Sequence, residues 1–291
     1  MKRKATVVYS VERSFVKSDI SILEALDLKV YKIHSSPEKN LFKFLLNRIM
    51  EKLKSILYLS RSKFLISWFN DYHSFIPILI SKLFFKKSII IVGGYDAIVD
   101  KKNIVIKEIN TGYDTRFWNY DQSEEKTGVL TAAFFSDKRV VNIKGLNIFN
   151  QLATLLPNVN FTIVGESGIR ISEFINLEPN IKVMGVQTKS EMKELYQKNK
   201  FYFQGSRLEG LPNSLCEAML CGCIPVGSRV FGIPDAIGTT GVLFDTEKDI
   251  EQMVEFINSD LGATDLKKAR NRIVRKYDIS KRTEKIRQNI F

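Results

Sequence analysis

The stretch SRLEGLPNSLCEAMLCGCIPVGSRVFGIPDAIGTTGVLFD, residues Ser206 to Asp245, decides the fold class of this 291-residue chain. It follows a short aromatic run, Phe201 to Gln204, which reads as a buried strand. The residues from Asn213 to Leu220 hold no helix breaker and follow a proline, which suits a helix entrance. The stretch therefore predicts a strand, a loop and a helix in that order.

Two acids in this stretch, Glu209 on the loop and Glu217 about one turn inside the helix, are separated by seven residues. Gly210 lets the backbone bend between them and approach a ligand closely. The first amides of a helix lack partners within it and lie at its positive end, where phosphate is favoured. We expect the acids to grip two parts of one nucleotide-sugar, with phosphate against the amides of Asn213, Ser214 and Leu215.

A second interpretation of these residues is structural. Ser214 and Glu217 have the spacing of a capping box, in which the glutamate only closes the start of the helix. The spacing of two acids does not by itself decide between a capping box and a ligand site. The motifs around them favour the ligand site.

Four motifs follow one another here: Glu209-Gly-Leu-Pro, Glu217-Ala-Met, Cys221-Gly-Cys-Ile-Pro-Val and Gly232-Ile-Pro-Asp. In this order the chain resembles the family-four, retaining glycosyltransferases of GT-B fold, whose C-terminal domain carries such a series. The resemblance covers roughly residues 109 to 291, and Asp235 stands where glutamate is commoner. It implies an α/β protein with two Rossmann-like domains that face each other across a cleft.

The implied domains are an N-terminal acceptor-side domain, residues 1–108, and a nucleotide-sugar-binding domain, residues 109–278. Residues 279–291 are expected to form a helix that crosses back to the first domain. The first domain is abbreviated, because Asp100-Lys-Lys-Asn leads directly to Ile104 where relatives carry further helices and a strand. A chain of this length is nevertheless long enough for two domains, each with its own core.

Two cations precede the helix that is predicted from Leu146 to Leu156. Arg139 and Lys144 have the spacing of the arginine and lysine that bind the donor diphosphate in the family. Two cations beside a helix start are also what a leaving pyrophosphate needs. Surface charge is the alternative interpretation, and Lys138 is a rival for the role of Arg139.

The resemblance assigns further residues of the second domain. Gly165-Glu-Ser-Gly168 is expected to form a tight turn after a strand from Asn160 to Val164, as in many Rossmann-like domains. Val186 belongs to the segment whose backbone flanks the nucleotide base. Together with the stretch quoted first, the expected donor-binding residues are Gly165, Val186, Gly210, Leu211, Asn213, Ser214, Leu215 and Glu217.

In the first domain, a predicted strand ends in Gly93-Gly-Tyr-Asp96, and strand ends of this kind face the crevice in open α/β sheets. By resemblance, Tyr95 and Asp96 are candidates near the reacting sugar. His73 at a helix entrance is a further candidate, although a lone histidine is more often an ordinary polar residue. The expected catalytic residues are Asp96, Arg139, Lys144 and Glu209.

The resemblance implies the roles of these groups. Glu209 contacts the donor sugar, and Glu217 binds the ribose hydroxyls, while Arg139 and Lys144 neutralise the departing diphosphate. Retention of the anomeric configuration, through a front-face route, comes from the family alone. No metal or other cofactor is expected, because the cations and the helix end carry that charge and the chain has no clear Asp-x-Asp motif.

The three cysteines, Cys216, Cys221 and Cys223, crowd one region with no histidine close in sequence, so we interpret them as structural, reduced thiols. The apolar region from Phe75 to Val92 is interrupted by three lysines and predicts no spanning helix. Met1-Lys-Arg-Lys leads into a strand rather than a signal sequence. We therefore expect a cytoplasmic protein.

The formal net charge is +12, and residues 1–100 carry 17 Lys and Arg against 9 Asp and Glu. This excess favours an anionic membrane surface or a lipid-phosphate acceptor, and it would also suit nucleic acid, which nothing else in the sequence favours. Asn40 to Leu59 read as a basic amphipathic helix. Its apolar positions, Leu41, Leu45, Ile49, Leu53 and Leu57, either dock on the sheet or lie on a membrane interface.

The function expected from the sequence is transfer of a hexose-type sugar from a UDP- or GDP-linked donor. The acceptor would be a glycan or lipid-linked molecule in surface polysaccharide or lipopolysaccharide assembly, with peripheral membrane contact. The alternative is a catalytically silent relative that binds donor or a partner without transfer. An NAD-dependent oxidoreductase is disfavoured, because no G-x-G-x-x-G follows a strand.

Overall fold

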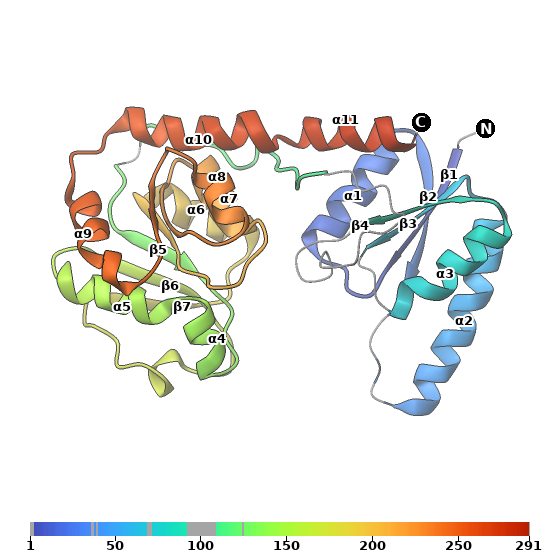
Figure 1. Ribbon diagram of the computed structural model, residues 1–291, viewed down its shortest axis with the longest axis horizontal. Helices are drawn as coiled ribbons and strands as arrows, with labels where there is room; N and C mark the ends of the chain where they lie inside the picture. Colours follow the sequence, from blue (N-terminus) through green and yellow to red (C-terminus); the bar gives the residue numbers. More distant parts are fainter. Residues whose placement is uncertain are drawn as a thin grey trace. The chain divides into compact units, whose positions relative to one another are not determined.

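The computed structural model describes residues 3–35, 38, 40–68, 72–91, 109–123 and 125–290. The chain divides into two compact units. Unit 1 is Met1–Ile109 with Thr283–Phe291, and unit 2 is Asn110–Arg282. Each unit is an α/β domain built on a parallel sheet of its own (Figure 1).

Unit 1 holds a four-stranded parallel sheet in the order β2-β1-β3-β4. Helix α1 (Ser14–Ala25) covers one face, and helices α2 (Leu41–Leu59) and α3 (Tyr72–Leu83) cover the other (Figure 1). The two central strands are almost wholly buried, which explains their nearly continuous apolar sequences. The strands are β1 (Arg3–Tyr9), β2 (Leu28–His34), β3 (Phe64–Trp68) and β4 (Lys87–Ile91).

Unit 2 holds a six-stranded parallel sheet in the order β10-β9-β8-β5-β6-β7. Alternate side chains of each strand enter two different cores, so Phe201 and Phe203 pack on one face and Tyr202 on the other. The strands are β5 (Val129–Ala132), β6 (Phe161–Glu166), β7 (Ile181–Gly185), β8 (Phe201–Gln204), β9 (Ile224–Ser228) and β10 (Val242–Phe244).

The helices of unit 2 lie on both faces of the sheet (Figure 1). Helices α5 (Leu146–Leu155) and α9 (Ile250–Asn258) pack together in one core. The second core contains α7 (Asn213–Leu220), α8 (Gly232–Ile237) and α10 (Ala263–Tyr277), with Tyr196 of α6 (Lys189–Lys198). A short helix, α4 (Lys138–Ile143), follows β5.

The predicted α/β architecture is confirmed, and the strand Phe201–Gln204 and helix Asn213–Leu220 agree with the prediction at both ends. The predicted tight turn at Gly165 is wrong, because β6 continues to Glu166. Gly165 forms an irregularity in the pairing with β7, and its φ is +121°. The basic C-terminal stretch forms two helices, α10 and α11 (Ile279–Ile290). None of the described helices is long and apolar enough to cross a membrane.

Candidate functional site

The candidate site lies where the direction of the crossovers reverses in the sheet of unit 2. Strand β5 leads to β6 on one side, whereas its neighbour β8 leads to β9 on the other. Ligands of open parallel sheets bind at the carboxyl ends of the strands at such a point. The residues that follow β5 and β8 are therefore the first to be considered, and they include Lys144 and Glu209.

Lys144 and Glu209 form an ion pair at this point. The Lys144 Nζ atom lies 2.7 Å from Glu209 Oε2, and the two side chains are 27% and 26% exposed. The Ser206 hydroxyl lies 3.4 Å from the same carboxylate oxygen and accepts a hydrogen bond of 2.7 Å from Gln204 Nε2. The structure thus brings together the predicted loop acid and a predicted cation, with room for solvent or a ligand on one side.

Two glycines allow this approach. Gly145, with φ +72°, lies so close to the loop after β8 that an added Cβ atom would be 2.2 Å from the Gly205 carbonyl oxygen. At Gly165 an added Cβ atom would be 2.3 Å from the carbonyl oxygen of Ala133. Only glycine fits at such contacts between backbones. The three strand-end segments after β5, β6 and β8 are consequently in direct contact.

The start of α7 offers hydrogen-bond donors beside the ion pair. Its N-cap is Pro212, which has no capping side chain, and its first backbone bond runs from Cys216 N to Pro212 O at 3.3 Å. In the described part of the chain, the amides of residues 213, 214 and 215 have no backbone partner. Such amides favour an anion.

The capping-box interpretation is wrong. Ser214 is the second residue of α7 rather than its N-cap, so it is not placed to form a capping box with Glu217. The Ser214 side chain instead hydrogen-bonds the Tyr202 side chain on β8. Leu215 is buried in the core, so its amide rather than its side chain is available to a ligand.

A tyrosine at the beginning of unit 2 fixes the first residue of α7. The Tyr113 hydroxyl donates a hydrogen bond of 2.9 Å to Asn213 Oδ1. The Tyr113 backbone is held in turn, because its amide donates to Tyr277 O and its carbonyl oxygen accepts from Ile279 N. Tyr113 is therefore a positioning residue that the sequence did not identify, although it lies within the motif from Asn110 to Asp114.

Glu217 has an unusual electrostatic environment. The side chain is largely buried, and the loss of solvation raises its pKa to about 7, against a smaller opposing effect of Lys189. Lys189 begins α6 and lies over an aromatic pair, with its Nζ atom 4.0 Å from the ring centre of Phe117 and 5.2 Å from that of Trp118. Glu217 is thus poised to change charge near neutral pH. Sequence reasoning missed Lys189, which comes four residues after the end of β7.

The remaining predicted residues are more scattered. Arg139 is exposed on α4 and Val186 is 55% exposed after β7. Asp235 pairs with Lys276 Nζ at 3.0 Å on α10. Tyr95 and Asp96 lie outside the described residues.

His73 and the three cysteines belong to the interior. His73 is buried in unit 1 with its Nε2 atom 2.8 Å from Trp68 O, which confirms that it is an ordinary polar residue there. All three cysteines are buried with free thiols in the second core of unit 2. Within the described ranges, no three His, Cys, Asp or Glu side chains are arranged to hold a metal ion.

Apolar side chains surround the site. Among the described residues of unit 2, five large apolar side chains are exposed, and four of them follow β5, β7, β8 and β9. These four are Phe134 (64% exposed), Val186 (55%), Leu208 (61%) and Phe231 (69%). Exposed apolar side chains that gather at one edge mark a binding surface, and sugar rings and bases suit such a surface. We call these four residues the apolar rim.

One member of the apolar rim adopts a backbone conformation that side chains disfavour. Phe231 has φ 45° and ψ −116°, and the turn is closed by a hydrogen bond of 3.1 Å from Ile233 N to Val230 O. These angles approximate the first central position of a type II′ turn, where glycine is usual. The next residue, Gly232, packs on the backbone of Gly210. The Phe231 turn therefore contacts the loop that carries Glu209.

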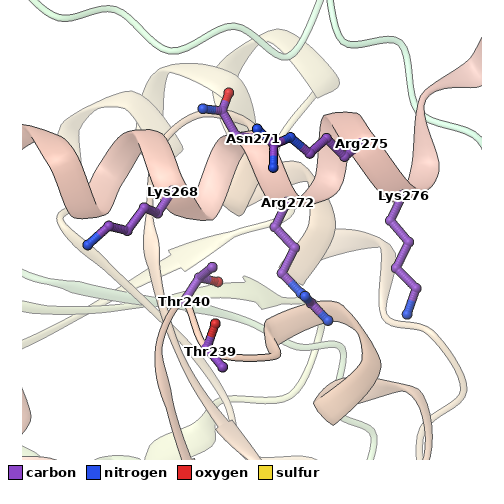
Figure 2. Close-up of a pocket in the computed structure, with 7 residues that line it drawn as sticks. All are labelled: Thr239, Thr240, Lys268, Asn271, Arg272, Arg275 and Lys276. Carbon is purple, nitrogen blue, oxygen red and sulfur yellow. The ribbon is translucent and has the colours of Figure 1, made fainter.

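The cavity shown in Figure 2 is separate from this site. It lies between α10 and the loop that enters β10, which is the amino end of that strand. Arg272 at its wall donates to Ala236 O and Asp235 O and thus closes the end of α8. Its basic residues are accordingly explained by the fold. The lining residues are Thr239, Thr240, Lys268, Asn271, Arg272, Arg275 and Lys276.

Two parallel-sheet α/β units, with an anion-favouring site at the reversal point of the second sheet, define the GT-B class of glycosyltransferases. The sequence pattern of the family described as glycosyl transferases group 1 matches residues 123–276, more than half of the chain. The chain belongs to this family. The predicted resemblance is thereby confirmed.

A plant relative agrees with this assignment. One of the subunits of the phosphatidylinositol N-acetylglucosaminyltransferase of Arabidopsis thaliana is 25% identical over 191 residues, which are 60% of this chain and 42% of that protein. The match thus spans less than half of that relative's length.

Solved structures match the whole chain. Anabaena HepE in complex with UDP and glucose has a TM-score of 0.71 at 14% identity, over 100% of this chain and 99% of HepE. A Rickettsia africae glycosyltransferase has a TM-score of 0.72 at 12% identity, over 99% and 98%. WaaG, a glycosyltransferase involved in lipopolysaccharide biosynthesis, has a TM-score of 0.66 at 12% identity, over 99% of both chains. At these identities the likeness shows the fold.

Proposed function

We propose that this protein is a retaining glycosyltransferase that moves a hexose-type sugar from a UDP- or GDP-linked donor. The acceptor is a glycan or a lipid-linked molecule in surface polysaccharide or lipopolysaccharide assembly. The observation that carries the proposal is the Lys144–Glu209 ion pair beside the unpaired amides of α7. A cation, an acid and a helix start at one point suit a ligand with both a diphosphate and hydroxyl groups.

In this proposal, donor binding rearranges the ion pair. Lys144 moves from the carboxylate to the diphosphate, where Arg139 and the amides of Gly210 to Leu215 add further donors. Glu209 is then free to accept hydrogen bonds from the sugar hydroxyls. As the bond to the sugar breaks, charge grows on the leaving phosphate, and preorganised cations and amides stabilise it.

Glu217, Val186 and Gly165 complete the donor site in the proposal. Glu217 accepts hydrogen bonds from the ribose hydroxyls, most strongly when it is ionised. The backbone near Val186 flanks the base, and Gly165 keeps the strand end open to the ligand. No metal is required in this scheme, because the cations and α7 supply the positive charge.

The comparisons support the donor class and the pathway. HepE was solved with UDP and glucose and also with UDP-glucose, and WaaG is described as acting in lipopolysaccharide biosynthesis. We place the enzyme in the cytoplasm, with a peripheral contact at the inner face of the membrane and without a nucleic-acid partner. The excess of basic residues near the N-terminus supports that location.

A transfer assay tests the proposal. The purified chain is incubated with UDP- and GDP-linked hexoses and with lipid extracts as acceptor, and the released nucleotide and the glycosylated product are measured. We expect turnover with one donor, a product with the donor's anomeric configuration by NMR, and loss of turnover in Glu209→Gln but not in the exposed control Glu255→Gln. An inverted product would contradict retention. Donor binding without any turnover would instead identify a silent relative.

A further inference from the structure

Helix α2 of unit 1 exposes its apolar face. The two residues that it buries fully are Ser55 and Leu59. The predicted apolar stripe faces solvent instead, so docking of that stripe on the sheet is wrong. The exposed apolar side chains are Leu41 (72%), Phe42 (76%), Leu45 (53%), Leu46 (50%), Ile49 (54%), Met50 (45%), Leu53 (56%), Ile56 (47%) and Leu57 (46%).

The face of α2 that turns inward carries charge. Arg48 and Glu51 form an ion pair whose side chains are only 14% and 13% exposed. Burial raises the pKa of Glu51, against the opposing effect of Arg48. A helix on a water-soluble domain buries its apolar stripe and exposes its charges. Helix α2 does the reverse, which is stable only if its outer face meets an apolar phase or partner.

Helix α3 extends this apolar surface. Phe75, Leu79 and Leu83 recur at every fourth residue, so they lie on one stripe, and they are 69%, 50% and 70% exposed. The two helices pack against each other and lie on the same side of the sheet (Figure 1). The exposed stripe of α3 thus belongs to the same side of unit 1 as α2.

Phe85, just after α3, is unfavourable in water for two reasons. It is 97% exposed and has φ 53°, a left-handed conformation. The hydrogen bond from Lys86 N to Ser81 O closes the helix end around it, which is the pattern that normally places glycine at this position. An aromatic ring at this position indicates that the ring itself is used.

The charges on the outer side of these helices have one sign. Glu51 is the single acid of α2, and it is paired inside, while α3 contains no acid. The lysines Lys43, Lys52, Lys54 and Lys82 are exposed around the apolar side chains. Apolar residues edged by lysines alone match an anionic bilayer surface.

We infer that α2, α3 and Phe85 form a docking surface for an anionic lipid bilayer, which we call the α2–α3 face. Helix α2, about 28 Å long at 1.5 Å per residue, lies in the plane of the interface with its leucines among the acyl chains and its lysines at the phosphates. No described helix could span the bilayer, so the contact is peripheral. The inference stands independently of the proposed transfer, because it needs no donor.

A sedimentation assay with the full chain tests the inference. The vesicles contain phosphatidylcholine alone or with phosphatidylglycerol. We expect binding to the mixed vesicles that is at least about tenfold stronger and weakens with salt. Leu45→Gln with Leu53→Gln should abolish binding, whereas the exposed control Leu155→Gln on unit 2 should leave it unchanged. Phe85→Gly should weaken binding while raising the melting temperature, since it removes a strained conformation.

Three results would overturn the inference. The first is no binding of the wild type to either vesicle, and the second is wild-type binding by the Leu45→Gln, Leu53→Gln variant. The third is dimerisation without vesicles that this variant abolishes, which would assign the face to a second copy of the chain. Thermal unfolding shows that each variant is folded. Nucleotide titration of the same proteins keeps this test separate from that of the proposed function.

Discussion

The Lys144 ammonium lies 2.7 Å from the Glu209 carboxylate, although 65 positions separate the two residues in the sequence. The contact joins the segments after β5 and β8, the two strands at which the direction of the crossovers reverses. Each side chain is about a quarter exposed, so the pair is open to exchange with a ligand. The predictions below follow from this contact and from its surroundings.

Lys144→Ala is expected to weaken binding of the donor nucleotide by about 2 to 4 kcal/mol, or about 30- to 1,000-fold. The reason is the loss of a charged hydrogen bond to the diphosphate in a partly buried site. Calorimetric titration measures the effect. Lys267→Ala on the outer surface of α10 is the matched control and should bind as the wild type does. A change of less than about threefold in Lys144→Ala would contradict the assigned role.

The Glu217 carboxyl predicts a dependence on pH. Its pKa is about 7 in the native protein against 4.5 for an unperturbed glutamate, so the native state holds the proton more tightly than the unfolded chain does. The contribution of Glu217 to stability is therefore complete below pH 4.5 and is lost as the pH rises through 7. The loss is at most about 3 kcal/mol in the free energy of unfolding.

Glu217→Gln removes this titration and retains the shape of the side chain. Above pH 7 we expect the variant to be more stable than the wild type, because no charge is buried. Nucleotide affinity of the wild type should rise as Glu217 ionises, whereas the affinity of the variant should be lower and free of this step. Unfolding and titration at a series of pH values measure both effects. An identical pH profile in the two proteins would exclude Glu217 as the titrating group.

Phe231→Gly is expected to stabilise the protein by about 1 kcal/mol, because glycine adopts the turn conformation of this residue without strain. Activity should fall nonetheless, because the exposed ring belongs to the apolar rim. Phe134→Gly is the matched control, since Phe134 is similarly exposed but has a negative φ. That variant should lose stability. Equal effects of both substitutions in thermal unfolding would rule out strain at Phe231.

Gly232→Ala is expected to disturb the site from outside it. The added Cβ atom would lie 2.7 Å from Gly210 O and 3.1 Å from Leu211 Cα, so the backbone must shift. We expect a loss of stability of about 2 kcal/mol and weaker nucleotide binding, since the shifted loop carries Glu209. Gly262→Ala, where an added Cβ atom meets nothing within 4 Å, should change neither. Wild-type binding by Gly232→Ala would show that the loop tolerates displacement.

Much of the fold followed from local patterns. The aromatic run of β8 and the breaker-free helix α7 were predictable at both ends, since turn residues bound them directly. The orientation of α2 was not predictable. Periodicity identifies an apolar stripe, but it does not say which side of a helix meets the domain, and here the Arg48–Glu51 pair faces inward. The abbreviation expected near Asp100 falls within residues 92–108, outside those described, and stays a prediction.

The site was predictable as far as motifs identified its residues. Glu209 and Lys144 were assigned separately to sugar and diphosphate, and their direct contact depends on the packing of Gly145 on Gly205, which no spacing reveals. Tyr113 and Lys189 were missed for a similar reason. Their roles arise from contacts with Asn213 and with the Phe117 ring across the fold. Positioning residues of this kind carry no pattern in the sequence.

Calorimetric titration with UDP and GDP, followed by their sugar conjugates, tests the central claim most directly. The proteins are the wild type and Glu217→Ala. The account predicts that the wild type binds one of the two nucleotides tightly and that Glu217→Ala abolishes this binding. Failure of the wild type to bind either nucleotide would contradict the account, and it would mean that the ion pair of Lys144 and Glu209 serves the fold rather than a donor.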